Sequence, residues 1–328
     1  MTLNKGKYNS ITDVPGVKVG HVTLYEELNE QDTICTGVTA ILPHNGNLFQ
    51  KKVRAAADVI NGFGKSAGLV QIEELGLLES PIMLTNTFSV GPVLEGTLTH
   101  MLSEDKTIGD STSSLNIVVG ECNDSYLNSM RLQAIKPHHA IDAIKNAQGG
   151  AIEQGAVGAG KGMVCFNYKG GIGTASRIVK EEKYEYTVGA LVLSNFGKRE
   201  DALFTDFPAQ DLTTPDGSIM MVIATDAPAN DRQLKRLAKR CAAGLARTGS
   251  YYAHGSGDIS IAFSTANPYF HSEKSAVETG EYLRDDHQVM NQLFLAVTEV
   301  IEEAIINSLK YARTTKGRNS RVIHKAPL

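Results

Sequence analysis

The feature that most constrains the fold is a series of short apolar runs that follow one another too closely for helices to connect them all. Each run is bounded by glycine, proline or asparagine, which is the pattern of β-strands separated by turns. The runs span residues 37–43, 81–85, 116–120, 162–166, 187–194, 218–224 and 258–264. Parallel strands need long crossover connections, so these spacings argue against a purely doubly wound parallel sheet. They favour an α+β fold in which helices cover largely antiparallel sheets.

Helical periodicity is clearest in two places, residues 231–247 and about 287–312. Asn230 or Asp231 is expected to cap the first of these helices, because short polar side chains satisfy the free N–H groups of a helix start. No internal repeat and no linker rich in proline or serine interrupts the sequence. We therefore expect residues 1–328 to form a single domain.

Composition excludes several classes of function. The net charge of −4 gives no reason to expect a nucleic-acid partner. No stretch approaches the roughly 18 apolar residues of a membrane span, and the amino terminus has no apolar segment typical of a secretion signal. The four cysteines are widely spaced, which fits neither a disulfide framework nor a zinc site. These observations predict a cytoplasmic protein that binds neither nucleic acid nor membrane.

The glycine-rich segment Gly155–Gly162 is similar to a phosphate-binding loop but lacks two of its features. Gly162 stands where that loop has a serine or threonine, and the strand-like run 162–166 follows where a helix is required. A pair of turns that lets two backbones approach closely is the better interpretation. The adjacent histidines His138 and His139 point in different directions and are not expected to chelate a metal. We expect no cofactor.

The segment Gly255–Asp258, with the sequence Gly-Ser-Gly-Asp, contains a serine that could be a turn residue or a nucleophile. It lacks the Gly-x-Ser-x-Gly elbow of serine hydrolases, because His254 and Asp258 occupy the flanking positions. Spacing alone favours a turn at Ser256. The alternative is a backbone cut between Gly255 and Ser256, which would give the serine both a hydroxyl nucleophile and an α-amine. Since an α-amine titrates near about 7.7–8.0, its neutral form can accept the hydroxyl proton.

A resemblance to a known family decides between these alternatives. The segments Gly255–Ile259 and Ala262–Asn267 resemble the nucleophile segment of the DmpA-type aminopeptidases, the L-aminopeptidase/D-Ala-esterase/amidase and β-peptidyl aminopeptidase family. Further blocks resemble the family in the same order along the chain, at residues 13–21, 84–91, 155–162, 170–177 and 225–228. The resemblance implies a four-layer α/β/β/α sandwich of the DmpA and ornithine-acetyltransferase type, similar to N-terminal-nucleophile hydrolases. It also implies a precursor that cuts itself into residues 1–255 and 256–328, which remain assembled.

The same resemblance implies the groups that stabilise the oxyanion. The family uses an asparagine and a tyrosine near the nucleophile, and the matching positions are Asn195 and Tyr126. From the sequence alone, Asn195 would be interpreted as a turn residue before Gly197, and Tyr126 as an ordinary half-buried tyrosine. Preorganised donors of this kind are what acyl transfer requires, because negative charge develops on the substrate carbonyl oxygen.

The family also places a serine and a glutamate, two residues apart, near the new amino terminus. In this chain they would lie on the C-terminal helix, where helical spacing puts Glu302 on an apolar stripe and Glu299 and Glu303 on the polar side. A carboxylate on an apolar stripe needs a partner, which the ammonium of Ser256 would provide. We therefore assign this role to Glu302, with Glu299 as the alternative. Val300 then occupies the serine position, a departure from the family pattern.

These inferences predict a self-processing aminopeptidase that removes N-terminal residues from small peptides, amides or esters. Ser256 would form an acyl-enzyme, and the active form would be a homo-oligomer of cleaved two-subunit protomers. Two alternatives remain open at this point. One is an acyltransferase related to the ornithine acetyltransferases, although these use threonine where this chain has serine. The other is an uncleaved homologue that binds small molecules without catalysis.

Overall fold

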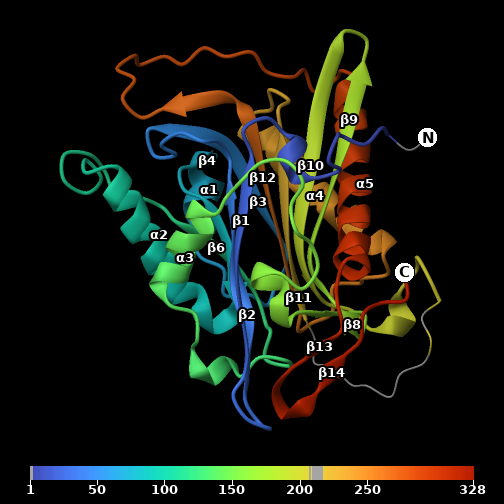
Figure 1. The fold of residues 1–328 in the computed structure, drawn as a ribbon. Helices are drawn as coiled ribbons and strands as arrows, with labels where there is room; N and C mark the ends of the chain where they lie inside the picture. Colours follow the sequence, from blue (N-terminus) through green and yellow to red (C-terminus); the bar gives the residue numbers. More distant parts are fainter. Residues whose placement is uncertain (1–2, 207, 209–216) are drawn as a thin grey trace.

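Two β-sheets pack face to face between two layers of helices in the computed structural model, which describes residues 3–206, 208 and 217–328 (Figure 1). The strand order is β1-β2-β5-β6 in the smaller sheet and β4-β3-β12-β11-β10-β9 in the larger one. The chain therefore folds as the four-layer α/β/β/α sandwich that the sequence predicts.

The strands of the smaller sheet are β1 (Lys18–Glu27), β2 (Thr33–Leu42), β5 (Ile82–Asn86) and β6 (Val118–Cys122). Those of the larger sheet are β3 (Lys51–Gly62), β4 (Leu77–Leu78), β9 (Gly171–Glu181), β10 (Tyr184–Asn195), β11 (Ser218–Thr225) and β12 (Gly257–Phe270). Two short hairpins are formed by β7 (Val164–Cys165) with β8 (Tyr168–Lys169), and by β13 (Thr315–Lys316) with β14 (Val322–Ile323). The α-helices are α1 (Leu69–Leu75), α2 (Val90–Glu104), α3 (Pro137–Lys145), α4 (Asp231–Arg247) and α5 (Val289–Lys310).

Apolar side chains fill each of the three spaces between the layers. Helices α2 and α3 cover the smaller sheet, where Val93 and Ala140 pack in one buried cluster with Val38. Between the sheets, Leu84 belongs to the same cluster as Val222. Since strands bury alternate residues on opposite faces, the larger sheet contributes to both of its neighbours.

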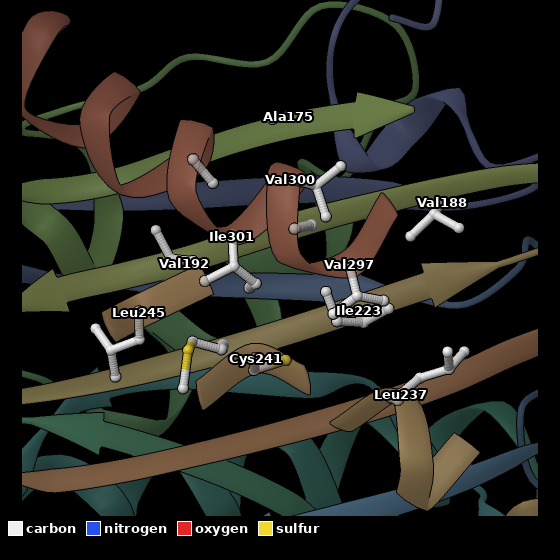
Figure 2. Close-up of a cluster of buried hydrophobic side chains, with 14 of the residues drawn as sticks. Ala175, Val188, Val192, Ile223, Leu237, Cys241, Leu245, Val297, Val300 and Ile301 are labelled. Carbon is white, nitrogen blue, oxygen red and sulfur yellow. The ribbon is translucent and has the colours of Figure 1, made fainter. Parts of the chain in front are cut away.

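Helices α4 and α5 cover the outer face of the larger sheet (Figure 2). Leu237 and Cys241 of α4 meet Val297 and Ile301 of α5 above Ile223 of β11, and all five side chains are fully buried. Deleting a buried branched side chain costs about 2–5 kcal/mol. This layer therefore fixes the position of the strands beneath it, including the strand that begins just after Ser256.

Helix α4 connects two neighbouring parallel strands, β11 and β12, so the starts of both strands lie side by side. The register pairs Ser218 with Gly257. The pair β5 and β6 is also parallel, while the other pairs within the two sheets are antiparallel. Most of the sheet structure is thus antiparallel, as predicted.

The structure confirms one of the predicted elements, the helix over residues 231–247, and shortens another, the strand over residues 162–166. Helix α4 spans the predicted residues, and the side chain of its cap, Asn230, accepts from the Gln233 N–H at 2.9 Å. The predicted strand over residues 162–166 is reduced to the two residues of β7, because Gly158–Gly162 forms a 3₁₀ turn. That turn confirms the close backbone approach: a Cβ atom on Gly160 would lie 2.5 Å from the Ile172 nitrogen.

Candidate active site

Ser256 lies immediately before β12, near the middle of the larger sheet, and it is buried. Its Oγ donates a hydrogen bond to Oδ1 of Asp258 at 2.8 Å. The two residues are two apart, so in an extended chain their side chains point to the same face. The hydroxyl is therefore held against a carboxylate rather than exposed in a surface turn.

The residues before Ser256 form a tight turn that is attached to β3. The Ser256 N–H donates to the carbonyl of Ala253 at 2.8 Å, and Tyr252 adopts a left-handed conformation with φ of 58°. From the end of β3, the Asn61 amide donates to the carbonyls of Ala253 at 3.0 Å and His254 at 3.3 Å, and also to that of Ser256. The segment on both sides of Gly255 is thus held by one side chain.

His254 does not act on the hydroxyl in this arrangement. Its side chain is exposed and lies beside the ring of Phe63, with 6.2 Å between the ring centroids. The histidine two residues before the serine is thus not placed to act as its base.

Asp258 is fully buried, and burial raises the pKa of its carboxyl group to about 6. Its Oδ1 accepts from Ser256, whereas its Oδ2 has no hydrogen-bond partner among the described residues. A buried carboxylate oxygen without a partner is costly, and such groups are concentrated at functional sites. Sequence reasoning missed this residue as a candidate, although its position two residues after Ser256 at the head of a strand was the available signal.

Asn195 ends β10 at the same edge of the sheet, two strands away from Ser256. The register pairs Asn195 with Ser218 and Ser218 with Gly257, which puts the Asn195 and Gly257 backbones about 10 Å apart. The Asn195 side chain accepts from the Val164 N–H at 2.8 Å and donates to the Asn123 carbonyl at 2.9 Å. Two backbone groups therefore fix its orientation.

Asn195 and Ser256 nevertheless use opposite faces of the sheet in the uncut chain. Asn195 lies two residues after Leu193, so its side chain points to the same face as Leu193, between the two sheets. Ser256 and Asp258 lie four and two residues before Ser260, which contacts helix α4, so they point to the helix-covered face. Phe196 and Gly197, the two residues after Asn195, line the same small pocket as Ser256. The structure thus brings Asn195 to the edge where Ser256 lies but does not aim its amide at the Ser256 hydroxyl.

Tyr126 lies in the loop after β6, half-buried against Val164 and Leu127. The guanidinium of Arg321 stacks on its ring at 4.5 Å from the centroid. Tyr126 packs against the cluster that contains Val164, and the Val164 N–H donates to Asn195, so the two predicted oxyanion donors lie in the same region.

Lys169 is a fully buried cation behind Asn195 that sequence reasoning also missed. Its Nζ donates to the carbonyls of Gly160 at 2.9 Å, Met163 at 2.7 Å and Gly170 at 2.8 Å. Burial lowers the pKa of Lys169 to about 7, while three acceptors match the three N–H groups of the ammonium form. The Met163 carbonyl belongs to the same peptide group as the Val164 N–H, so Lys169 helps to hold the donor that orients Asn195.

The two glutamates proposed from the helical pattern have other partners, and their predicted burial was wrong. Glu299 is buried and accepts from Nε of Arg177 on β9 at 2.8 Å, and Glu303 pairs with the same guanidinium at 2.7 Å. Glu302, predicted on the buried stripe, is 34% exposed and pairs with Arg247 of α4 at 3.2 Å. The cause is the buried arginine of β9, which draws two carboxylates of α5 inward.

Neither Glu302 nor Glu299 hydrogen-bonds to Ser256 in the described part of the uncut chain, so their contact with a new amino terminus stays a prediction. Val300, at the position of the family serine, packs in the apolar layer of Figure 2.

A small pocket of about 40 Å³ adjoins Ser256 and admits a water molecule. Part of its wall is formed by Tyr251 and Ala253, which precede the predicted cut. No group of three or more His, Cys, Asp or Glu side chains within residues 3–206, 208 and 217–328 is placed to hold a metal ion. Within the same ranges, no helix is both long and apolar enough to cross a membrane.

Comparison with known proteins identifies the family. The model of peptidase family S58 matches residues 9–323. The chain belongs to this family. Two curated relatives, both named beta-peptidyl aminopeptidase BapA, are 39% identical in Sphingosinicella microcystinivorans and 34% in Sphingosinicella xenopeptidilytica. The alignments cover 98% of this chain in both cases, and 86% and 85% of the relatives.

Solved structures of similar proteins agree in fold. The PH0078 protein from Pyrococcus horikoshii OT3 has a TM-score of 0.93 at 52% identity, covering 100% of this chain and 93% of that one. A Burkholderia sp. beta-aminopeptidase has a TM-score of 0.91 at 38% identity, with coverages of 99% and 92%. The L-aminopeptidase D-Ala-esterase/amidase from Ochrobactrum anthropi, described as a variant of the Ntn-hydrolase fold, has a TM-score of 0.92 at 32% identity, with coverages of 99% and 93%. The protein is therefore a peptide-bond hydrolase of the serine-aminopeptidase type, and the acyltransferase and binding-protein alternatives are not favoured.

Proposed function

We propose that this aminopeptidase is activated by cleavage between Gly255 and Ser256 and then uses Ser256 as an N-terminal nucleophile. The observation that carries the proposal is the position of Ser256: a buried serine at the head of a central strand, preceded by a turn that Asn61 holds in place. Cleavage releases the α-amine of Ser256, which has the pKa range of a base that works near neutral pH.

In the mature enzyme, the Ser256 hydroxyl attacks the carbonyl of the substrate's first residue while the α-amine takes the proton. The amide of Asn195 and the hydroxyl of Tyr126 stabilise the oxyanion. Because the uncut chain holds the serine and Asn195 on opposite faces of the sheet, this step requires Ser256 to turn toward Asn195 once the turn before it is released. Water then hydrolyses the acyl-enzyme, and no cofactor takes part.

The substrates are small peptides, amides or esters with a free amino terminus. The names of the relatives refer to β-peptidyl aminopeptidase, L-aminopeptidase and D-Ala-esterase/amidase activities, and so to peptides with a β- or L-residue at the amino terminus and to esters or amides of D-alanine. A free amine as the recognition element is common to these compounds. We further propose a cytoplasmic homo-oligomer of cleaved protomers, and the four unpaired, buried cysteine thiols are in keeping with a reducing compartment.

Hydrolysis assays on the purified protein test the function. We expect release of p-nitroaniline from alanine and β-alanine p-nitroanilides, and no release from the N-acetylated forms of the same compounds. Ser256→Ala should lose activity on every substrate. Equal turnover of free and N-acetylated compounds would contradict an aminopeptidase, and an active Ser256→Ala variant would contradict the nucleophile.

A further inference from the structure

The first cut cannot use the base that serves the mature enzyme. Before cleavage, the nitrogen of Ser256 is part of a peptide bond, and its N–H donates to the Ala253 carbonyl at 2.8 Å. Resonance delocalises the lone pair of a peptide nitrogen into the carbonyl group. That nitrogen therefore cannot accept the proton of the Ser256 hydroxyl, and the precursor needs another base.

The structure offers one group in the required position. Oδ1 of Asp258 accepts from the Ser256 hydroxyl at 2.8 Å, within the range for proton transfer. The carboxyl group is fully buried, and its Oδ2 has no partner among the described residues. No arginine, lysine or histidine in the described ranges forms an ion pair with it.

The titratable side chains that interact with Asp258 are neutral near pH 7. They are Cys122, on β6 of the smaller sheet, and Tyr252, from the turn before the cut, and burial raises the pKa of both. Neither supplies a positive charge that would hold the carboxylate in its ionised form. Asp258 is thus free to exchange a proton with the serine.

We propose that Asp258 is the general base, and then the general acid, of the self-cleavage between Gly255 and Ser256. This inference rests on the proposed function, because it explains how the nucleophile of the mature enzyme is produced.

The reaction balances without a cofactor. The Ser256 Oγ forms a bond to the Gly255 carbonyl carbon, and the hydroxyl proton moves to Asp258. The bond from that carbon to the Ser256 nitrogen then breaks, and Asp258 returns the proton to the departing nitrogen. The product is an ester between Gly255 and Ser256 with a free amine. Water hydrolyses the ester to a Gly255 carboxylate and the Ser256 hydroxyl, and the adjoining pocket of about 40 Å³ admits that water.

Asn61 fixes the position of the peptide bond that is cut. Its amide donates to carbonyls on both sides of Gly255, so the reacting peptide is held while Asp258 holds the hydroxyl. Holding both reactants in place converts attack into an intramolecular step with little loss of entropy.

The protonation of Asp258 gives the cleavage a characteristic pH dependence. Burial raises the pKa of this carboxyl group to about 6, and only its ionised form is a base. The cleavage rate should therefore rise with pH through about 6 and level off above about 7. A base that is an α-amine would instead give a rise near about 8.

The test follows cleavage of the full chain after cell-free synthesis and a shift to buffers between pH 5 and 8, with denaturing mass spectrometry over time. Asp258→Asn preserves the size of the side chain but is not a base. We expect its cleavage at pH 7.5 to be slower by about 10²-fold or more, with no rise near pH 6. Asp226→Asn is the matched control, because Asp226 is a partly buried aspartate whose pKa is also raised by burial, at the far end of β11. It should be cut at the wild-type rate.

Two results would overturn the role of Asp258: cleavage of Asp258→Asn within about threefold of wild type, or a wild-type rate that is flat between pH 5 and 7. The pH profile of the wild type needs no variant, so the proposal is testable even where Asp258→Asn unfolds. Failure of the proposed function gives a different result, since Ser256→Ala would then be cut or the cut protein would lack aminopeptidase activity.

Discussion

The ion network between β9 and α5 allows a stability prediction with a defined magnitude. Arg177 is 4% exposed, and its guanidinium pairs with Glu299 at 2.8 Å and with Glu303 at 2.7 Å. Arg177→Met keeps most of the side-chain volume but leaves two largely buried carboxylates without this cation. Breaking a buried ion pair by removing one partner costs about 3–5 kcal/mol.

The expected change in melting temperature follows from the size of the chain. Unfolding entropy is about 2.1 cal/mol/K per residue, which gives roughly 0.7 kcal/mol/K for 328 residues. A loss of about 3–5 kcal/mol therefore lowers Tm by about 4–7 °C, which differential scanning calorimetry measures directly.

A surface pair between β9 and β10 provides the control. Lys180 and Glu185 are 2.8 Å apart, but their side chains are 61% and 60% exposed, and exposed pairs contribute about 0–1 kcal/mol. Lys180→Ala should thus lower Tm by less than about 1.5 °C. Equal shifts for Arg177→Met and Lys180→Ala would refute the reasoning that burial makes this network strong.

Three further predictions concern the site. Asn195→Ala should lower kcat by about 10²–10³, and Tyr126→Phe should lower it in the same direction, in steady-state assays of the cut enzyme; unchanged kcat in both would remove the oxyanion assignment. Glu302→Gln should lower kcat/KM of the cut enzyme by about tenfold or more, because the predicted contact with the new amino terminus is a charge-assisted hydrogen bond worth about 1.5–3 kcal/mol; a change of less than about threefold would leave Glu302 with its surface partner Arg247 alone. Lys169→Met removes a donor from three buried carbonyls, of which those of Gly160 and Met163 keep a backbone donor, and should lower the free energy of unfolding by about 1–3 kcal/mol in urea titrations, whereas unchanged stability would show that the ammonium is dispensable.

The sequence predicts the layers of the fold better than the details within them. Apolar runs bounded by turn residues correctly indicate strands such as β11 and β12, and the capped periodic segment 231–247 corresponds to α4. Strands such as β3 (Lys51–Gly62) carry charged residues within an apolar pattern and are not recognised from composition. Their neighbours in the sheet, rather than local preference, make them strands.

In the site, too, residues within a local motif are predicted from the sequence, whereas residues contributed by distant strands are not. A motif of adjacent residues locates Ser256. The resemblance to the family points to Tyr126 and to Asn195, and the structure places Asn195 at the same edge of the sheet as Ser256. The helical pattern misplaced Glu299 and Glu302, because it contains no information about the arginine of β9 that faces the helix. Residues contributed by other strands, such as Asn61, give no local signal and become visible only in the folded chain.

The proposed mechanism requires Ser256 to become an amino terminus. Denaturing mass spectrometry of the purified wild-type protein, with Edman sequencing of the smaller product, tests it most directly. We expect two species, residues 1–255 and 256–328, the second beginning with Ser256-Gly257-Asp258, and a single uncut chain for Ser256→Ala. A single intact species of 35.3 kDa that hydrolyses amino-acid amides would contradict it.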